Sequence, residues 1–159
     1  DGASDHWRYY AVLNGNYSVT WSYSRFGNNI TPTSSHFYVS NGEETNEGDD
    51  EYLALLFASV DGISKVGSYV GSGSAGNAQT LGFTPRFLLM KATNANGGWS
   101  ITDSFNQDLD ASGDEKYLDL NSEGAQYTGD YVDTTATGFT FTGAGWNASN
   151  THYIYYAHA

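Results

Sequence analysis

The sequence predicts an all-β protein that folds as an antiparallel β-sandwich of the jelly-roll or lectin-like kind. Short aromatic or β-branched runs alternate with stretches of Gly, Asn, Ser and Thr, which is the composition of strands joined by turns. Glycine is frequent at 19 residues and tyrosine contributes 13, whereas proline occurs only twice. Helical spacing of apolar residues does not persist over ten or more positions. A chain of 159 residues is long enough to bury a core.

The N-terminal third predicts four strands. Residues 6–13 form an apolar and aromatic run that ends at Asn14-Gly15, a strong hairpin signal. Residues 17–23 alternate large apolar with small polar side chains, as in a strand with one buried face. Two further runs, 37–39 and 52–58, flank an acidic loop and complete the set.

The remainder of the chain predicts a longer series of strands. Pro85 stands just before the most continuous apolar run, where a missing backbone donor is tolerated. The turn at 94–98 is rich in Asn and Gly and predicts a hairpin. The expected strands are 64–70, 87–90, 99–102, 116–120, 127–132, 138–142 and 153–157.

Two similar apolar segments, 52–58 and 153–159, predict a tandem repeat. The first copy would occupy 1–62 and the second 63–159. The first copy is incomplete, because it has no counterpart of 65–69 or of 87–90. An incomplete sandwich exposes strand edges, which proteins normally cover. We therefore expect a homo-oligomer, or residues upstream of Asp1 that complete the first copy.

The net charge of −12, with only six Lys and Arg residues and no basic cluster, argues against binding to nucleic acid. The same charge argues against an anionic membrane surface. Cysteine is absent, which excludes disulfides and thiolate metal sites. Apolar runs never approach 18 residues, so membrane insertion is not expected.

Five motifs occur in order along the second copy: Lys65-Val-Gly-Ser-Tyr-Val-Gly-Ser-Gly73, Gly82-Phe-Thr-Pro-Arg-Phe-Leu-Leu-Met-Lys91, Trp99-Ser-Ile-Thr-Asp-Ser104, Gly138-Phe-Thr-Phe141 and Tyr153-Ile-Tyr-Tyr-Ala157. With these motifs the chain resembles a repeated domain of virion proteins from marine bacteriophages, especially phages of cyanobacteria, of a tail-fibre or lectin-like kind. The resemblance implies a β-sandwich, a virion structural or host-attachment role, and other virion proteins as partners. It supplies no catalytic residues.

One loop, 143–150, carries the residues that we single out as a ligand or subunit contact: Trp146, Asn147 and Asn150. Trp7 and Trp99 occupy matching positions of the two copies inside strands, where packing in the core explains them. Neither alternation nor burial explains Trp146. A stacking surface for a host-surface glycan is one interpretation, and a contact between subunits is the other.

An acid-rich stretch, 108–115, is the candidate calcium site, with Asp108, Asp110, Asp114 and Glu115 as ligands. Calcium takes six to eight oxygen ligands, and clustered carboxylates supply them. The acidic loop 43–51 is a weaker candidate, since its spacing does not match a helix-loop-helix calcium site. Acidic turns that only maintain solubility are the alternative for both, so calcium is a possible ligand rather than a required cofactor.

Catalytic patterns do not emerge. The four histidines lack ligand spacing, and no Gly-x-Ser-x-Gly motif joins a strand to a helix. Residues 15–22 resemble a strand of jelly-roll xylanases, but the glutamate-bearing strand motifs of those enzymes are missing. We therefore expect a non-enzymatic structural protein on the virion exterior, as a capsid decoration or a tail-fibre segment. The alternative is a carbohydrate-binding receptor module, and a secreted glycan hydrolase is less favoured.

Overall fold

The computed structural model describes residues 9–22, 25–26 and 30–159, and the chain divides into two compact units. The first unit contains the described residues among 1–12 and 19–56. The second contains 13–18 and 57–159. The segment 13–18 thus belongs with the C-terminal part of the chain, although the predicted repeat placed it in the first copy. The repeat itself stays a prediction.

The described residues of the first unit form little regular structure. Strand β1 (Tyr9–Tyr10) pairs antiparallel with β2 (Thr20–Trp21), and Phe26 forms an isolated bridge with Val39. The strands predicted at 6–13 and 17–23 therefore reduce to two residues each among the described positions, while Trp7 lies outside them. The strand predicted at 52–58 is wrong. This segment is exposed and forms no strand, because it pairs with none of the described strands.

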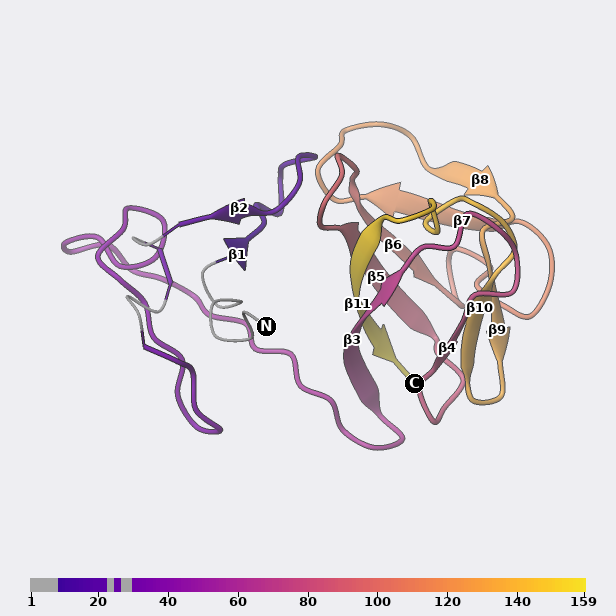
Figure 1. Cartoon of the computed structure of the whole chain (residues 1–159), viewed down its shortest axis with the longest axis horizontal. Helices are drawn as coiled ribbons and strands as arrows, with labels where there is room; N and C mark the ends of the chain where they lie inside the picture. The colour runs from indigo at the N-terminus through magenta and orange to yellow at the C-terminus, as the bar shows by residue number, and fades with distance from the viewer. Residues whose placement is uncertain (1–8, 23–24, 27–29) are drawn as a thin grey trace. The chain divides into compact units, whose positions relative to one another are not determined.

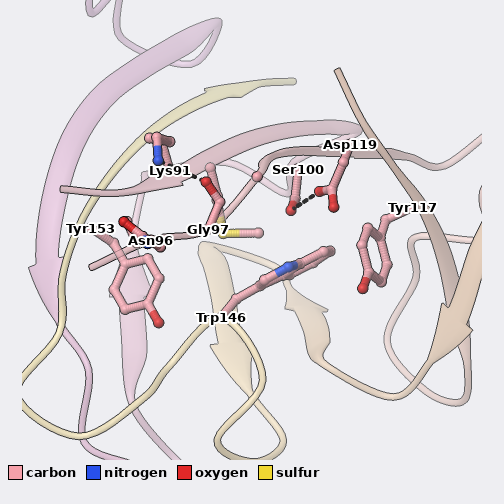
Figure 2. A pocket seen from close by; sticks show the side chains of 11 residues that line it. Lys91, Asn96, Gly97, Ser100, Tyr117, Asp119, Trp146 and Tyr153 are labelled. Atoms are coloured by element: carbon pink, nitrogen blue, oxygen red, sulfur yellow. Dashed lines mark hydrogen bonds between the residues drawn. The ribbon is translucent and has the colours of Figure 1, made fainter. Parts of the chain in front are cut away.

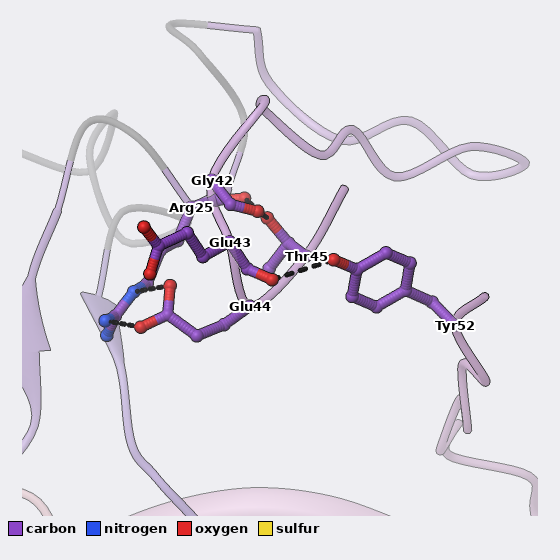
Figure 3. A network of polar contacts seen from close by, with 6 residues as sticks. All are labelled: Arg25, Gly42, Glu43, Glu44, Thr45 and Tyr52. Carbon is purple, nitrogen blue, oxygen red and sulfur yellow. Dashed lines mark hydrogen bonds and ion pairs between the residues drawn. The ribbon is translucent and has the colours of Figure 1, made fainter. Parts of the chain in front are cut away.

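The acidic loop 43–51 forms an ion pair and hydrogen bonds with other residues of the chain (Figure 3). Arg25 binds both carboxylate oxygens of Glu44, with Nε 2.8 Å from Oε2. The Thr45 hydroxyl donates to the carbonyl of Arg25 at 2.8 Å, and the Tyr52 hydroxyl donates to the carbonyl of Glu43 at 2.7 Å. These contacts give the loop a defined local structure through an ion pair and hydrogen bonds.

The second unit contains a six-stranded antiparallel sheet in the order β3-β11-β5-β6-β7-β8 (Figure 1). Its strands are β3 (Ser64–Val70), β5 (Phe87–Ala92), β6 (Trp99–Asp103), β7 (Glu115–Asp119), β8 (Tyr127–Gly129) and β11 (His152–His158). Five of these strands lie where the sequence predicts them, with shifts of a few residues at the ends. The single strand predicted at 127–132 is wrong, because only 127–129 joins this sheet and Val132 begins a strand of a second sheet. The C-terminal strand β11 is the second strand from one edge, between β3 and β5, and so joins two strands that come earlier in the chain.

A three-stranded sheet, β4-β10-β9, covers one face of the larger sheet. It consists of β4 (Ala78–Thr80), β9 (Val132–Thr135) and β10 (Gly138–Phe141). Rings from the two sheets meet in the core: Phe139 lies edge-on to Tyr155 at 5.5 Å, and Phe141 lies 4.8 Å from Tyr69. The predicted antiparallel β-sandwich is therefore confirmed.

A glycine permits tight packing between the edge strand β3 and its neighbour β11. Gly67 is the register partner of Tyr155, and a Cβ at Gly67 would overlap the phenol ring. The Tyr155 side chain therefore lies across the backbone of β3, on the core side. Alternate residues of β11 point to the opposite face, so that Tyr153, Tyr155 and Ala157 are buried while Ile154 is exposed.

Candidate functional site

A cavity of about 200 Å³ opens in the second unit beside the 94–98 turn, and we call it the Trp146 pocket. Its walls come from β5, β6, β7, β11 and the loop that carries Trp146 (Figure 2). The lining combines aromatic rings with polar side chains: Trp146, Tyr117, Tyr153, Asn96, Ser100 and Asp119. This mixture of ring surface and a few polar groups is typical of small-molecule sites.

Trp146 is held in place by other aromatic rings. Its indole stacks on Tyr131 at 5.1 Å and meets the edge of Tyr117 at 4.8 Å. Gly129 and Gly145 leave room for this arrangement, since a Cβ at either glycine would overlap the Tyr131 ring. Trp146 also has a left-handed backbone with φ of 51°, which is rare for a bulky residue and is typical of functional or tightly constrained sites. The indole is therefore fixed before any ligand arrives.

Asn147 does not face a ligand, because it is fully buried with 0% exposure. Its Nδ2 donates to the carbonyls of Ser74 and Gly143, each at 2.8 Å. Its Oδ1 accepts from the backbone amide of Ser72 at 2.9 Å and from Nδ2 of Asn77 at 2.7 Å. The side chain thus joins the 143–150 loop to the 71–77 loop. Its role is to position Trp146.

The loop is anchored to the core on both sides of Asn147. The Tyr69 hydroxyl donates to the carbonyl of Trp146 at 2.6 Å, and the amide of Ala148 donates to the Tyr153 hydroxyl at 3.1 Å. Asn150, by contrast, is exposed and does not line the pocket. Its carbonyl accepts a hydrogen bond from Asn94 at 3.2 Å. Of the three predicted contact residues, only Trp146 therefore lines the cavity.

The polar side of the pocket is formed by β6 and β7. Ser100 and Asp119 are register partners, and the Ser100 hydroxyl donates to Oδ1 of Asp119 at 2.6 Å. Gly98 makes space for this carboxylate, because a Cβ there would overlap it. Sequence reasoning missed Tyr117, Ser100 and Asp119. Their meeting depends on the register between β6 and β7, which no local pattern reveals.

Lys91 lies at the pocket wall but its ammonium is already bound. The residue is 1% exposed, and Nζ donates to the carbonyl of Tyr17 at 2.9 Å and to that of Gly97 at 2.7 Å. Burial lowers the pKa of the Lys91 ammonium below its ordinary value. The Lys91 ammonium holds the 13–18 segment and the 94–98 turn and is therefore not offered to a ligand. The charged group that the pocket offers is the Asp119 carboxylate.

The four acids proposed for calcium have separate surroundings. Asp108 forms an ion pair with Lys116, and Asp110 accepts a hydrogen bond from the Ser112 amide at 2.7 Å. Asp114 is exposed. Among the residues that the structure describes, no group of three or more His, Asp or Glu side chains is placed to hold a metal ion. The arrangement gives no support to a calcium site, which stays a prediction.

Glu115, the fourth acid, is 1% exposed. Its Oε1 accepts from the backbone amides of Tyr131 at 2.7 Å and Val132 at 3.0 Å, so it fixes the start of β9. Its Oε2 is buried without a hydrogen-bond partner among the described residues. Burial raises the pKa of Glu115 to about 7, and the nearby Asp130 carboxylate acts in the same direction.

Comparison with known proteins gives a family but no activity. A family model described as a domain of unknown function, DUF7483, matches residues 5–159. Neither a curated protein nor a solved structure matches the chain. Within the described ranges, no helix has the length and apolar character needed to cross a membrane.

Proposed function

Because this chain belongs to the family described as domain of unknown function DUF7483, which names no activity, we propose its function from the fold, the site and the motif resemblance. The proposal is a non-enzymatic structural module on the exterior of a bacteriophage virion, as a capsid decoration or a tail-fibre segment, among other virion proteins. The antiparallel sandwich agrees with the resemblance. The net charge of −12 suits a surface that must avoid non-specific adhesion to nucleic acid.

The Trp146 pocket supports a second activity on that exterior, recognition of a host-surface glycan. Flat aromatic rings offer an apolar surface to the C–H faces of a sugar ring, while the polar atoms of Asn96, Ser100 and Asp119 are suited to hydroxyl groups. The single observation that carries this proposal is the pre-positioned Trp146 indole at the wall of a polar cavity. A rigid site of this kind binds with less loss of side-chain entropy.

The charge of the pocket favours a neutral sugar. Asp119 offers a carboxylate, whereas the ammonium of Lys91 is bound by two carbonyl groups. An acidic sugar, such as a uronic or sialic acid, would bring a second negative charge to Asp119, and like charges repel in a partly buried site. We therefore expect hexoses or N-acetylhexosamines to bind better than acidic sugars.

Hydrolysis of the glycan is less favoured. Glycosidases of the common type use two carboxyl groups on either side of the bond that is cleaved. Asp119 is the only acid among the lining residues, and its Oδ1 accepts a hydrogen bond from Ser100. Release of reducing sugar from host polysaccharide by the purified protein would contradict a non-enzymatic role.

The location is tested on purified particles. Antibody raised against residues 57–159, with gold labelling in the electron microscope, is expected to decorate intact virions. Detection of the chain only in the soluble fraction of the host lysate, after particles are removed, would exclude the structural proposal.

Recognition is tested with a glycan array followed by calorimetric titration. Trp146→Ala is expected to weaken binding about tenfold or more, which corresponds to about 1.4 kcal/mol. Asp119→Asn should weaken the binding of neutral sugars less than Trp146→Ala does. It should also reduce the preference for neutral over acidic sugars. Asn150→Gly is the matched control, since Asn150 lies in the same loop outside the pocket. Equal binding by wild type and a folded Trp146→Ala variant would remove the pocket from consideration.

A further inference from the structure

An exposed apolar segment where the first unit meets the second forms no strand pairing with any described residue. We define the apolar segment as residues 52–58. The exposed fractions are 87% for Leu53, 72% for Leu55, 76% for Leu56 and 57% for Phe57. Single exposed leucines are common on protein surfaces, but a continuous run of large apolar side chains is not. The segment has the composition of a strand and nevertheless pairs with none.

The sandwich carries a matching surface on the face of the six-stranded sheet opposite the core. Five residues are direct register partners across adjacent strands, and we call them the outer row: Val66, Tyr156, Leu89, Ile101 and Leu118. All five are apolar or aromatic and all retain exposed surface. A solvated sheet face normally alternates to polar residues, so this row is typical of a face that another layer covers.

The chain itself shows that the two surfaces are compatible. The ring of Phe57 lies 4.8 Å from that of Tyr156, at the outer row. The next residues are held at the edge of β3, because Val60 bridges Ser64 and the Ser59 hydroxyl accepts from the amide of Val66 at 3.0 Å. One end of the apolar segment is thus seated on the row.

We propose that two copies of this chain associate through these surfaces, with the apolar segment of each copy extending over the outer row of the other. Both halves of the contact are present on one chain, so a twofold arrangement satisfies both at once. The proposal gives a surface to the homo-oligomer expected from the sequence. It does not depend on what the Trp146 pocket binds, since none of the residues in either surface lines that pocket.

The available area corresponds to a weak dimer. A fully buried aliphatic or aromatic side chain contributes about 1.5–3 kcal/mol at about 25 cal/mol per Å², which corresponds to about 60–120 Å². Scaled by the exposed fractions, the apolar segment and the exposed apolar residues of β3 and β11 provide about 300–550 Å² per copy. Two copies would then bury about 600–1,100 Å², which is the size of a weak or transient interface.

Charge distinguishes a second copy from other partners. The apolar segment is uncharged, with Glu51 before it and Asp61 shortly after it, and each copy carries −12 overall. Two copies repel one another at long range, and salt screens this repulsion. Self-association should therefore strengthen as salt increases. Association with a basic partner protein would weaken instead.

Sedimentation velocity of the full chain over a wide range of concentrations tests the proposal. Wild type is expected to form a dimer with a dissociation constant in the micromolar range, lower at about 0.5 M salt than at about 0.05 M. The double variant L53E/L56E should stay monomeric, and Val66→Lys should raise the dissociation constant about tenfold or more. Phe105→Glu is the matched control, because Phe105 is 84% exposed and lies outside both surfaces.

Cross-linking identifies the surfaces directly. The chain has no cysteine, so Leu56→Cys and Leu118→Cys chains can be mixed and treated with a short bismaleimide. A covalent heterodimer is expected, and its yield should fall on dilution. A wild-type monomer at every concentration and salt, or a dimer unchanged by L53E/L56E, would overturn the proposal. Glycan binding by the folded monomeric variant should be unchanged, which separates this test from that of the pocket.

Discussion

The buried carboxyl group of Glu115 makes the stability of the folded protein depend on pH. The group accepts two backbone hydrogen bonds through Oε1, yet Oε2 has none among the described residues. The folded protein therefore favours the protonated form and the pKa rises to about 7, whereas the unfolded chain has the ordinary value of 4.5. Between these two pH values the unfolded state has lost a proton that the folded state keeps. Stability must fall as pH rises through this window.

Glu115→Gln is expected to remove most of this pH dependence. The amide oxygen of Gln can still accept the amides of Tyr131 and Val132, and the side chain stays neutral. The free energy of unfolding of wild type should fall by up to about 3 kcal/mol between pH 4.5 and pH 7.5, because the pKa of Glu115 is 4.5 in the unfolded chain and about 7 in the folded protein. The variant should not show this fall. Urea unfolding at a series of pH values measures it. Glu123→Gln, an exposed carboxyl group, is the control and should follow wild type, and an identical slope for Glu115→Gln would contradict the role.

Asn147→Ala should destabilise the sandwich and also weaken pocket binding. Removal of the amide breaks its hydrogen bonds to the backbone of Ser72, Ser74 and Gly143. Each of these bonds contributes about 0.5–1.5 kcal/mol, so a total loss of about 2–4 kcal/mol is expected. Chemical denaturation of the variant beside Asn150→Gly measures it. A loss no greater than that of the control would show that water replaces the amide.

Residue roles were only partly predictable from the sequence. Trp146 stands out because it is a large aromatic residue in a loop of small and polar residues. Asn147, its neighbour, has the same local signal but is a buried connector. The difference comes from Ser72, Ser74 and Asn77, which are more than 60 positions away along the chain. A local pattern carries no information on such contacts.

At the scale of elements, strand β5 contributes side chains to both faces of the sheet. Leu88, Met90 and Ala92 enter the core, while Lys91 points to the outer face and holds the 13–18 segment. The same segment accepts a second bond, from the amide of Gly97 to the carbonyl of Asn16 at 2.7 Å. This clamp explains why a short N-terminal segment belongs with the C-terminal unit.

Lys91→Met should release that segment. The variant keeps an apolar stem of similar length but leaves the carbonyls of Tyr17 and Gly97 without their donor, at a cost of about 1–3 kcal/mol. Hydrogen exchange followed by mass spectrometry should show faster exchange at Gly97 and across 13–18. Lys65→Met on β3 is the matched control. Unchanged protection at Gly97 would mean that Lys91 does not hold the segment.

Strands were predictable from the sequence where a strand-like pattern of residues also has a partner strand in the fold. Strands β3, β5, β6, β10 and β11 were found from sequence, since each has strand-forming residues and turn residues at both ends. The segment 52–58 has the same composition as β11 and failed as a prediction. A strand needs an adjacent strand to receive its hydrogen bonds, and β11 has β3 and β5 whereas 52–58 has neither. Composition alone does not show whether a neighbour exists.

At the scale of the whole molecule, the chain consists of a regular sandwich and a first unit whose described residues form little sheet structure. The fold class was predictable because composition and periodicity report on it throughout the chain. The division into units was less so, since the 13–18 segment crosses it. The predicted repeat is not matched by equal amounts of secondary structure among the described residues of the two parts.

Limited proteolysis should separate the two parts at the apolar segment. A chymotrypsin-like enzyme cuts after large apolar residues, and 52–57 offers several that are exposed outside any strand. The first product should therefore begin within 53–58 and retain the circular dichroism of a β protein. Phe105 is equally exposed, but its amide is bound to Oδ1 of Asp103 at 2.8 Å, so cleavage there should be slower. Earliest cleavage inside the sandwich would contradict this organisation.

The hydrogen bond from Tyr69 to the carbonyl of Trp146 connects the pocket wall to the centre of the hydrophobic core. A ligand that holds the indole therefore also holds the sandwich, and occupancy becomes part of the folding equilibrium. At a ligand concentration of about 100 times the dissociation constant, this linkage adds about 2.7 kcal/mol to the free energy of unfolding. If the pocket binds a host glycan, attachment would make the attached module more resistant to heat and proteases than the free one.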